Sequence, residues 1–337
     1  MKKLEEDFME GNLKKGLFFG GLVGFAWGLD TVLMGLVGSS TILKTSSSST
    51  LVSAFLHDAF CFFWLVLVAL FNRQLMDTFK LLKTKKGKAT FLAALVGAPI
   101  GMSGYVIGIK YAAPAYASSL SVIYPGVGAV LSYFILKEKL SKRAIIGITV
   151  SLVGSAALGY SKVDLNMYPE FYKGMAFTLL AVLGWASEGV IIGYAMKKIK
   201  DEEHIKATPQ QFLTLRYLTS FVVYGAIIMP MVDGYKVVGQ LAANRELLYF
   251  PGIAILGAIT YLSWYKAVNY IGASMGTALN STAAFWAIAF SSLILGTEIT
   301  PYLAICGLVI ILGVFIFAVD FKEFFGKKNK VQKLKEV

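Results

Sequence analysis

Two acidic residues stand inside apolar stretches, each three residues after a tryptophan. Asp30 follows Trp27 and Glu188 follows Trp185, so the two motifs are 158 residues apart. A helix rises about 1.5 Å per residue, which places both motifs near the centre of a hydrocarbon layer about 30 Å thick. An acid there costs about 2.5–3.5 kcal/mol, and such groups usually belong to ion or substrate paths. We therefore expect at least one of the two acids to be functional.

Each of these residues also has a structural interpretation. The tryptophans are too deep for an interfacial aromatic belt, so they are either packing residues or ring faces of a cavity. The two acids are paired with His57 or Arg216, or are kept neutral by burial. His57 either relays protons or is satisfied by the adjacent Asp58. Arg216 stands a turn or two from the predicted cytoplasmic end of its span, so we expect its side chain to snorkel.

Further aromatic and polar side chains in the apolar stretches are available to a central cavity. Four to six rings beside a carboxylate suit an organic cation, because each ring face contributes about 0.5–2 kcal/mol. A quaternary ammonium fits best, since it has no N–H to satisfy. An anionic substrate would need a central Arg or Lys, which we expect the chain to lack. The predicted substrate-binding residues are Trp27, Tyr105, Tyr124, Trp185, Glu188, Tyr261, Trp264 and Asn280, with Trp286 as a further ring, and the predicted ion-coupling residues are Asp30, His57 and Glu188.

The elements that must position these residues are membrane helices. Of the 337 residues, 56% are hydrophobic and only 15% are charged, whereas soluble domains carry about 25% charged residues. Ten apolar segments have about the length that spans a bilayer. The sequence therefore predicts an all-α membrane protein with ten transmembrane helices, at 17–38, 50–71, 90–111, 115–137, 142–160, 172–196, 211–231, 247–267, 273–296 and 300–319.

The net charge of +12 indicates membrane orientation and not binding to nucleic acid. Of the 32 Lys and Arg residues, 25 lie at the chain ends and in the even-numbered connections. Because basic residues accumulate on the cytoplasmic side, both termini are predicted to be cytoplasmic. We expect a multi-pass protein of the cell membrane, as a monomer or homodimer, whose partners are the lipid bilayer and a small cationic substrate.

The two halves of the chain resemble each other. Lys15-Gly16 recurs as Lys173-Gly174, and the Tyr105…Lys110 pair recurs as Tyr261…Lys266, in the same order as the Trp-x-x-acid motifs. Each half contains five predicted spans, so the second half must enter the membrane from the opposite side. The sequence predicts two inverted five-helix repeats, 1–160 and 161–320, and a basic cytoplasmic tail, 321–337. In secondary transporters, such repeats enclose a substrate site near the bilayer midplane.

Glycine and proline positions predict how the helices pack and where they break. Gly16, Gly20, Gly24 and Gly28 recur every four residues and present one smooth helix face. Pro99 and Pro125 fall inside the third and fourth spans and are expected to kink or interrupt them. The aligned positions in the second half carry no proline, so the halves need not move alike. Glu138 and Glu298 stand at helix ends and are interpreted as local structural residues.

The chain offers little chemistry for catalysis. It contains two histidines and two cysteines, and Cys61 and Cys306 both lie in apolar runs. It has no His-Glu-x-x-His, Gly-x-Ser-x-Gly or P-loop motif. We expect no enzyme activity, no metal and no cofactor.

Several local motifs resemble a known family over nearly the whole chain. The five-plus-five repeat, with Leu-Lys-Glu-Lys-Leu-Ser at 136–141 and Leu-Gly-Thr-Glu-Ile-Thr at 295–300, resembles the EamA-type carriers of the drug/metabolite transporter superfamily. Both copies depart from that superfamily's Leu-Gly-Glu motif, at Lys137 and Thr297. The stretches 21–29, 99–105, 123–129 and 183–188 look like those of bacterial choline permeases.

This resemblance implies an alternating-access carrier that takes up choline, driven by protons, through an aromatic cage. It places Trp27, Tyr105, Trp185 and Glu188 among the binding residues. Export of drugs or aromatic amino acids, which is common in the superfamily, is the alternative.

Overall fold

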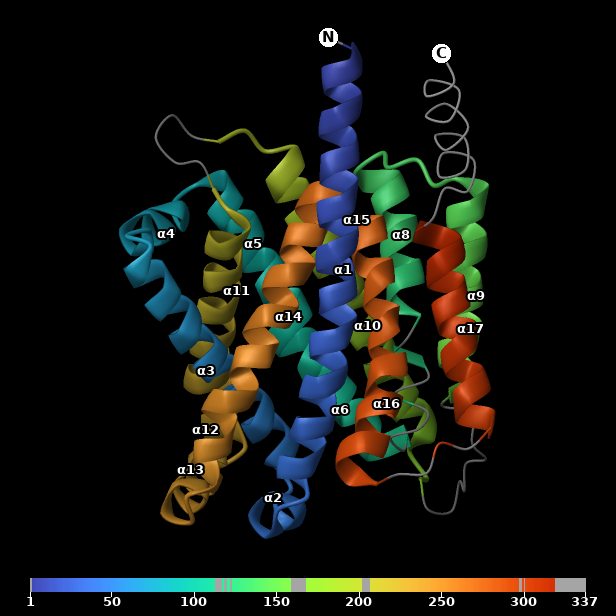
Figure 1. Ribbon diagram of the computed structural model, residues 1–337. Coiled ribbons are helices and arrows are strands. Elements are labelled where there is room, and N and C mark those ends of the chain that lie inside the picture. The colour runs from blue at the N-terminus through green and yellow to red at the C-terminus, as the bar shows by residue number, and fades with distance from the viewer. Residues whose placement is uncertain are drawn as a thin grey trace.

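The computed structural model describes residues 2–112, 117, 120–121, 123–158, 168–201, 207–296, 299 and 301–318, and every regular element in this part of the chain is a helix (Figure 1). The predicted tail, 321–337, and Glu298 lie outside the described residues. The long helices and helical runs are α1 (Lys2–Gly38), α3 (Ser49–Phe71), α5–η1–α6 (Lys85–Leu95, Val96–Ile100, Gly101–Ala112), α8 (Tyr124–Ile135), α9 (Lys142–Leu158), α10 (Phe171–Lys197), α11–η2–α12 (Pro209–Val223, Tyr224–Ile228, Met229–Met231), α14 (Tyr249–Ile271), α15–η4–α16 (Ala273–Ala278, Leu279–Thr282, Ala283–Leu295) and α17 (Pro301–Ala318). Short helices α2 (Thr41–Thr45), α4 (Leu75–Leu81), α13 (Gly234–Ala243) and η3 (Glu246–Leu248) lie in the connections.

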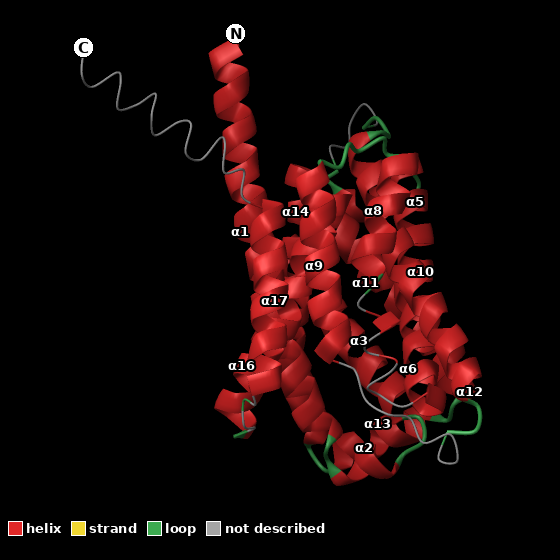
Figure 2. Ribbon diagram, turned by 90° about the vertical axis from the view of Figure 1, so that its right-hand side faces the viewer, coloured by secondary structure: helices red, strands yellow, loops and turns green. Residues whose placement is uncertain are grey.

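Seven helical segments of the described chain are long and apolar enough to cross a membrane. They begin at residues 11, 49, 85, 171, 209, 246 and 273, which agrees with seven of the predicted spans. Shorter apolar helices, Tyr124–Ile135 and Ala304–Gly313, fall within two of the other three. The protein is therefore an integral membrane protein built from apolar helices, which run side by side with α2 and α13 at the end opposite to the N-terminus (Figure 2).

Helices that are distant in the sequence pack in close pairs. α1 lies along α14 and α16, α6 lies along α10, and α9 lies along α17. The predicted glycine stripe of α1 faces α14 to α16 and allows this approach. A Cβ atom added at any of its four positions would collide with a side chain there. The colliding residues are Ile271, Leu279, Thr282 and Trp286. The stripe is therefore confirmed as scaffold.

Both prolines stand at irregular points of their predicted spans, one as a distortion and one as an interruption. Pro99 lies inside the π-helical turn η1, where its missing N–H and its ring widen the helix. The aligned part of α14 is a regular helix, so the two halves differ here as predicted. Pro125 stands in the first turn of α8, where a proline is well tolerated because the N–H there has no helical partner. The predicted span 115–137 is therefore interrupted here: residue 123 is a turn and α8 begins at Tyr124, so Pro125 starts a helix.

Glu138 joins the end of α8 to the start of α15. Its carboxylate accepts hydrogen bonds from the backbone N–H groups of Ala273 and Ser274, both at 3.1 Å, and from the Ser274 hydroxyl at 2.7 Å. Gly272 precedes this helix with a φ of 94°, a conformation that other residues avoid. A carboxylate at a helix N-terminus satisfies free donors and the helix dipole. Its predicted role as a local structural residue agrees with these contacts.

Candidate functional site

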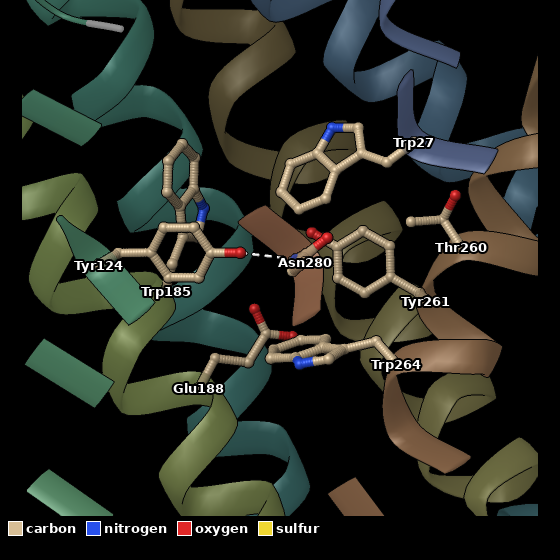
Figure 3. A pocket seen from close by; sticks show the side chains of 8 residues that line it. All are labelled: Trp27, Tyr124, Trp185, Glu188, Thr260, Tyr261, Trp264 and Asn280. Atoms are coloured by element: carbon tan, nitrogen blue, oxygen red, sulfur yellow. Dashed lines mark hydrogen bonds between the residues drawn. The ribbon is translucent and has the colours of Figure 1, made fainter. Parts of the chain in front are cut away.

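Seven of the eight predicted substrate-binding residues line one pocket in the middle of the helices (Figure 3). The space between atoms here measures about 290 Å³, open solvent included. Its walls come from α1, α8, α10, α14 and η4, and so from both halves of the chain. The lining residues are Trp27, Tyr124, Trp185, Glu188, Thr260, Tyr261, Trp264 and Asn280. Thr260 is the one member that the sequence did not single out.

The aromatic rings of the pocket are held by edge contacts between them. The ring of Trp185 lies 5.7 Å from that of Tyr124, at 74°, and 5.3 Å from that of Tyr105. The ring of Tyr261 lies 5.7 Å from that of Trp264, at 76°. Edge-to-face pairs at these distances are favourable, and they leave ring faces turned to other neighbours. Figure 3 shows the pair Tyr124 and Trp185 on the left and the pair Tyr261 and Trp264 to their right, with Trp27 above Tyr261 and Glu188 below Trp185.

Two polar atoms of the pocket have no hydrogen-bond partner among the described residues. Asn280 donates from Nδ2 to the Tyr124 hydroxyl at 2.6 Å, but its Oδ1 is buried and unpartnered, as is Oγ1 of Thr260. Trp264 instead donates its indole N–H to Thr277 at 3.2 Å. A buried polar atom without a partner costs about 1–3 kcal/mol, so the two free oxygens mark where a ligand with a hydrogen-bond donor would gain stability.

Glu188 and Arg216 form a buried ion pair. The side chains are 1% and 2% exposed, and Arg216 donates from Nε to Glu188 Oε1 at 3.1 Å. Tyr265 donates its hydroxyl to the same oxygen at 3.1 Å. The guanidinium carbon also lies 4.1 Å from the centre of the Tyr261 ring, a cation–π distance. The alternative in which Arg216 pairs with one of the acids is therefore the arrangement present.

Two expectations about Arg216 were wrong. Its side chain does not snorkel to the membrane surface, and the chain does have a central arginine. The reason is that Arg216 begins the third turn of α11 and faces two carboxylates across the helix bundle, Glu188 and Asp58. The ion pairs and hydrogen bonds of the guanidinium take the place of the water that it would reach by snorkelling to the membrane surface.

Asp58 extends the charged network from Arg216 to His57. It accepts from Arg216 Nη1 at 3.3 Å and from Ser220 Oγ at 2.5 Å, both on Oδ2. His57 Nδ1 lies 3.3 Å from Asp58 Oδ1, and His57 Nε2 lies 3.2 Å from Asp30 Oδ1. A neutral imidazole has one N–H, so it can donate to only one of these two carboxylates, whereas the protonated ring donates to both. The histidine is thus placed to gain or lose a contact when it takes up or releases a proton.

A larger cavity adjoins the pocket and contains the other predicted residues. It encloses about 970 Å³, open solvent included, and shares Trp27, Thr260 and Tyr261 with the pocket. Tyr105, the eighth predicted binding residue, lies here, as do Asp30 and His57. Asp58 and Arg216 also line it, so the charged network runs along the border between the two spaces.

Some site residues were not predicted, and one predicted ring lies elsewhere. Trp286 packs on Phe25, Phe285 and Phe290 and does not line either cavity. Asp58 and Tyr265 were missed as partners of Arg216 and Glu188. Asp58 carried a signal, because it is an acid within a span beside a histidine. Within the described residues, no group of three or more His, Cys, Asp and Glu side chains could hold a metal ion.

Two segments of the chain, 14–160 and 172–319, match the EamA-like transporter family, and the chain belongs to this family. The protein is therefore a transporter of the drug/metabolite transporter superfamily. Among curated proteins, it is 28% identical to Protein LicB of Haemophilus influenzae over 90% of this chain and 97% of that protein. It is 23% identical to the uncharacterized transporter YyaM of Bacillus subtilis over 64% of this chain and 69% of that protein.

A WAT1-related protein of Arabidopsis thaliana is 30% identical over about a third of each chain, 32% in both. One solved structure, titled only "Crystal structure of protein", superposes with a TM-score of 0.68 at 13% identity. It covers 90% of this chain and 96% of the other, and the likeness concerns the fold alone.

Proposed function

We propose that this chain is a secondary transporter that takes up choline or a similar quaternary ammonium across the cell membrane. The observation that carries the proposal is the pocket itself. Five aromatic side chains and one buried carboxylate surround a single space between helices from both halves of the chain. The five rings are Trp27, Tyr124, Trp185, Tyr261 and Trp264.

A quaternary ammonium matches this lining for a physical reason. It carries a positive charge but no N–H, so it needs no hydrogen-bond acceptors around its methyl groups. Ring faces compensate for the lost water by about 0.5–2 kcal/mol each. Glu188 supplies the counter-charge within the same pocket. A primary ammonium would need acceptors for three N–H groups, and the aromatic walls do not provide them.

The unpartnered oxygens favour choline over a plain tetraalkylammonium. Choline has one hydroxyl, which can donate a single hydrogen bond. Asn280 Oδ1 and Thr260 Oγ1 are buried in the pocket lining and have no partner among the described residues. A hydroxyl bound to either oxygen removes the cost of leaving that atom unpaired, a net gain of about 0.5–1.5 kcal/mol.

Alternating access would come from two inverted five-helix repeats that rock around the pocket. Support comes from the two family matches, which cover similar lengths of the two halves, and from the pairing of α1 with α14 and of α6 with α10. With both termini cytoplasmic, the larger cavity lies on the outer side, because it is lined by the later turns of α1 and the first turns of α3. A cavity that reaches the pocket from that side suits uptake.

Coupling to protons would use Asp30 and His57. These side chains are each 13% exposed and line the larger cavity, so water can reach them. Protonation of His57 lets the ring donate to Asp30 and Asp58 together. This link connects a proton-accessible group to the carboxylate that also binds Arg216.

Export of drugs or aromatic amino acids is the second candidate, and the central arginine favours it. Arg216 lines the larger cavity beside the aromatic pocket, where a guanidinium can bind the carboxylate of an amino acid. Against it, Arg216 already binds two carboxylates of the protein.

A binding panel on the purified full-length protein separates these candidates. Choline, tetramethylammonium, betaine, tryptophan and a buffer blank are compared by thermal shift, because a ligand of the folded state raises its apparent stability. We expect the largest shift with choline. Uptake of labelled choline into proteoliposomes, without sodium, then tests transport. A shift with tryptophan and none with choline would overturn the proposal in favour of the second candidate.

A further inference from the structure

Arg216 occupies the groups that a substrate cation would need. Its Nε donates to Glu188, the one acid among the described residues that line the pocket. Its guanidinium carbon lies 4.1 Å from the centre of the Tyr261 ring, which also lines the pocket. A carboxylate and an aromatic face are the two elements that bind an organic cation. In this structure, the guanidinium of Arg216 therefore already binds one carboxylate, Glu188, and one aromatic ring, Tyr261.

We propose that Arg216 is a tethered cation that competes with the substrate: it must release Glu188 and pair with Asp58 alone before the substrate can bind. The inference rests on the proposed function, since it assumes a cationic substrate in the same pocket. It assigns two specificity-determining roles. Arg216 blocks the pocket against weak cations, and Asp58 is the carboxylate that receives the guanidinium.

The hydrogen bonds around both carboxylates permit this transfer. Arg216 already donates from Nη1 to Asp58 at 3.3 Å while Nε holds Glu188. When the guanidinium leaves, Glu188 keeps the hydroxyl of Tyr265. Asp58 accepts a hydrogen bond from the Ser220 hydroxyl, which fixes the position of the oxygen that also binds the guanidinium. Neither acid is left without a donor in either position.

The balance of charge favours an exchange of cations. Arginine stays protonated in proteins, so Arg216 always requires a carboxylate nearby. With both acids ionised, Glu188, Asp58 and Arg216 together carry one negative charge. A monovalent substrate cation makes this group neutral, with one cation for each carboxylate. Because the three side chains are mostly or fully buried, the neutral group is the more favourable one to keep away from water.

The cavities place the transfer on the substrate's route. Glu188 lines the pocket, Asp58 lines the larger cavity, and Arg216 lines the larger cavity next to Tyr261, which belongs to both. Movement of the guanidinium toward Asp58 therefore takes it away from Glu188 and leaves that carboxylate free to face the pocket.

A double-mutant cycle tests the competition, with tetramethylammonium as the probe and isothermal titration calorimetry on the purified full-length protein. Arg216→Gln removes the competing cation, and we expect the probe to bind about tenfold tighter, the effect of about 1.4 kcal/mol. Arg216→Lys keeps the charge and should not bind tighter than the unmodified protein. Asp58→Asn removes the receiving carboxylate, and we expect the probe to bind more than about tenfold weaker.

The double variant distinguishes competition from a simple loss of negative charge. If Arg216 is the competitor, Asp58→Asn has little effect in the Arg216→Gln background, so the two changes are strongly non-additive. If Asp58→Asn weakens probe binding equally in the unmodified protein and in the Arg216→Gln variant, the inference is overturned. Circular dichroism and size-exclusion chromatography check folding. If Arg216→Gln does not fold, the other two variants carry the test. Unchanged affinity of Asp58→Asn for tetramethylammonium then overturns the inference. Weaker binding by Asp58→Asn, together with unchanged binding by Arg216→Lys, supports it.

The two proposals fail in different ways. Binding by the unmodified protein, with equal or weaker binding by Arg216→Gln, overturns the tethered cation and leaves the proposed function intact. Binding by Arg216→Gln alone supports the tethered cation but counts against the proposed function, because the unmodified protein then does not bind a quaternary ammonium. No binding by any variant overturns both.

Discussion

The two halves of the chain contain corresponding acid–base pairs that differ in chemistry. In the first half, Asp30 pairs with His57, and in the second half, Glu188 pairs with Arg216. The acids are 158 residues apart and the bases 159. The first pair is 13% exposed and lines the larger cavity. The second pair is almost completely buried, with Glu188 in the lining of the pocket and Arg216 in that of the larger cavity.

The difference suggests a division of work between the halves. A histidine can change its charge near neutral pH, and an arginine cannot. The water-accessible pair is therefore suited to exchanging protons, and the buried pair is suited to holding a fixed positive charge against a substrate cation. Asp58 touches both bases, which makes it the link between the two pairs.

The largest expected effect comes from neutralising the buried acid. Glu188→Gln removes the one carboxylate among the described residues that line the pocket. We expect binding and uptake of choline to fall by more than about 100-fold, within the range of about 2–5 kcal/mol that the loss of one partner of a buried charge pair costs in binding. Asp30→Asn should leave binding within about threefold, because Asp30 lies outside the pocket. Labelled choline uptake and calorimetry measure both variants.

Glu138→Gln is the matched control, since Glu138 caps α15 and lines neither cavity. It should bind choline normally. Equal loss in the Glu188 and Asp30 variants would contradict the division of work.

The next effect concerns the driving force. An inward-directed gradient of about one pH unit can drive about tenfold accumulation in a one-proton symporter. His57→Gln removes the titratable group, so we expect no accumulation above equilibrium, while exchange of labelled for unlabelled choline continues. The measurement uses proteoliposomes in sodium-free buffer at imposed pH gradients. Undiminished accumulation in His57→Gln would assign proton coupling to another group.

The two central tryptophans give a smaller and graded effect. Trp185 is held between the rings of Tyr105 and Tyr124, so its removal takes away one ring face and loosens two others. We expect Trp185→Ala to weaken choline binding by about 10- to 30-fold, and Trp27→Ala by about 3- to 10-fold. Phenylalanine at each position should restore most of the affinity. A larger loss at Trp27 than at Trp185 would reverse this ranking.

The smallest effect should appear in selectivity. Asn280→Ala removes the unpartnered oxygen proposed to accept the choline hydroxyl. We expect the preference for choline over tetramethylammonium to shrink by about 2- to 10-fold, as for one hydrogen bond. Tetramethylammonium affinity serves as the internal reference, because it has no hydroxyl. An unchanged ratio of the two affinities would move the hydroxyl contact to Thr260 or exclude it.

The sequence predicted much of the candidate site because the residues that signal it are energetically unfavourable or unusual at the centre of a membrane helix. Trp27, Trp185 and Glu188 were found from their depth, their residue types and the recurrence of the Trp-x-x-acid motif, and they line the pocket. Thr260 gave no such signal, since threonine is common where membrane helices pack. Tyr265 is one of 17 tyrosines, and its spacing did not set it apart from the others. Trp286 had the same signal as the true lining rings, and only packing shows that it faces Phe25 and Phe290.

The sequence alone established that the chain is a helical membrane protein with charged groups at its centre. The length of its apolar segments and the recurrence of the Trp-x-x-acid motif are sufficient for this. Only the tertiary structure decided which base meets which acid. Arg216 looked like a surface anchor because depth along one helix says nothing about the carboxylates that neighbouring helices bring. Whether a buried charge is tolerated depends on partners within a few ångströms, and those distances are properties of the packed helices and not of any single one.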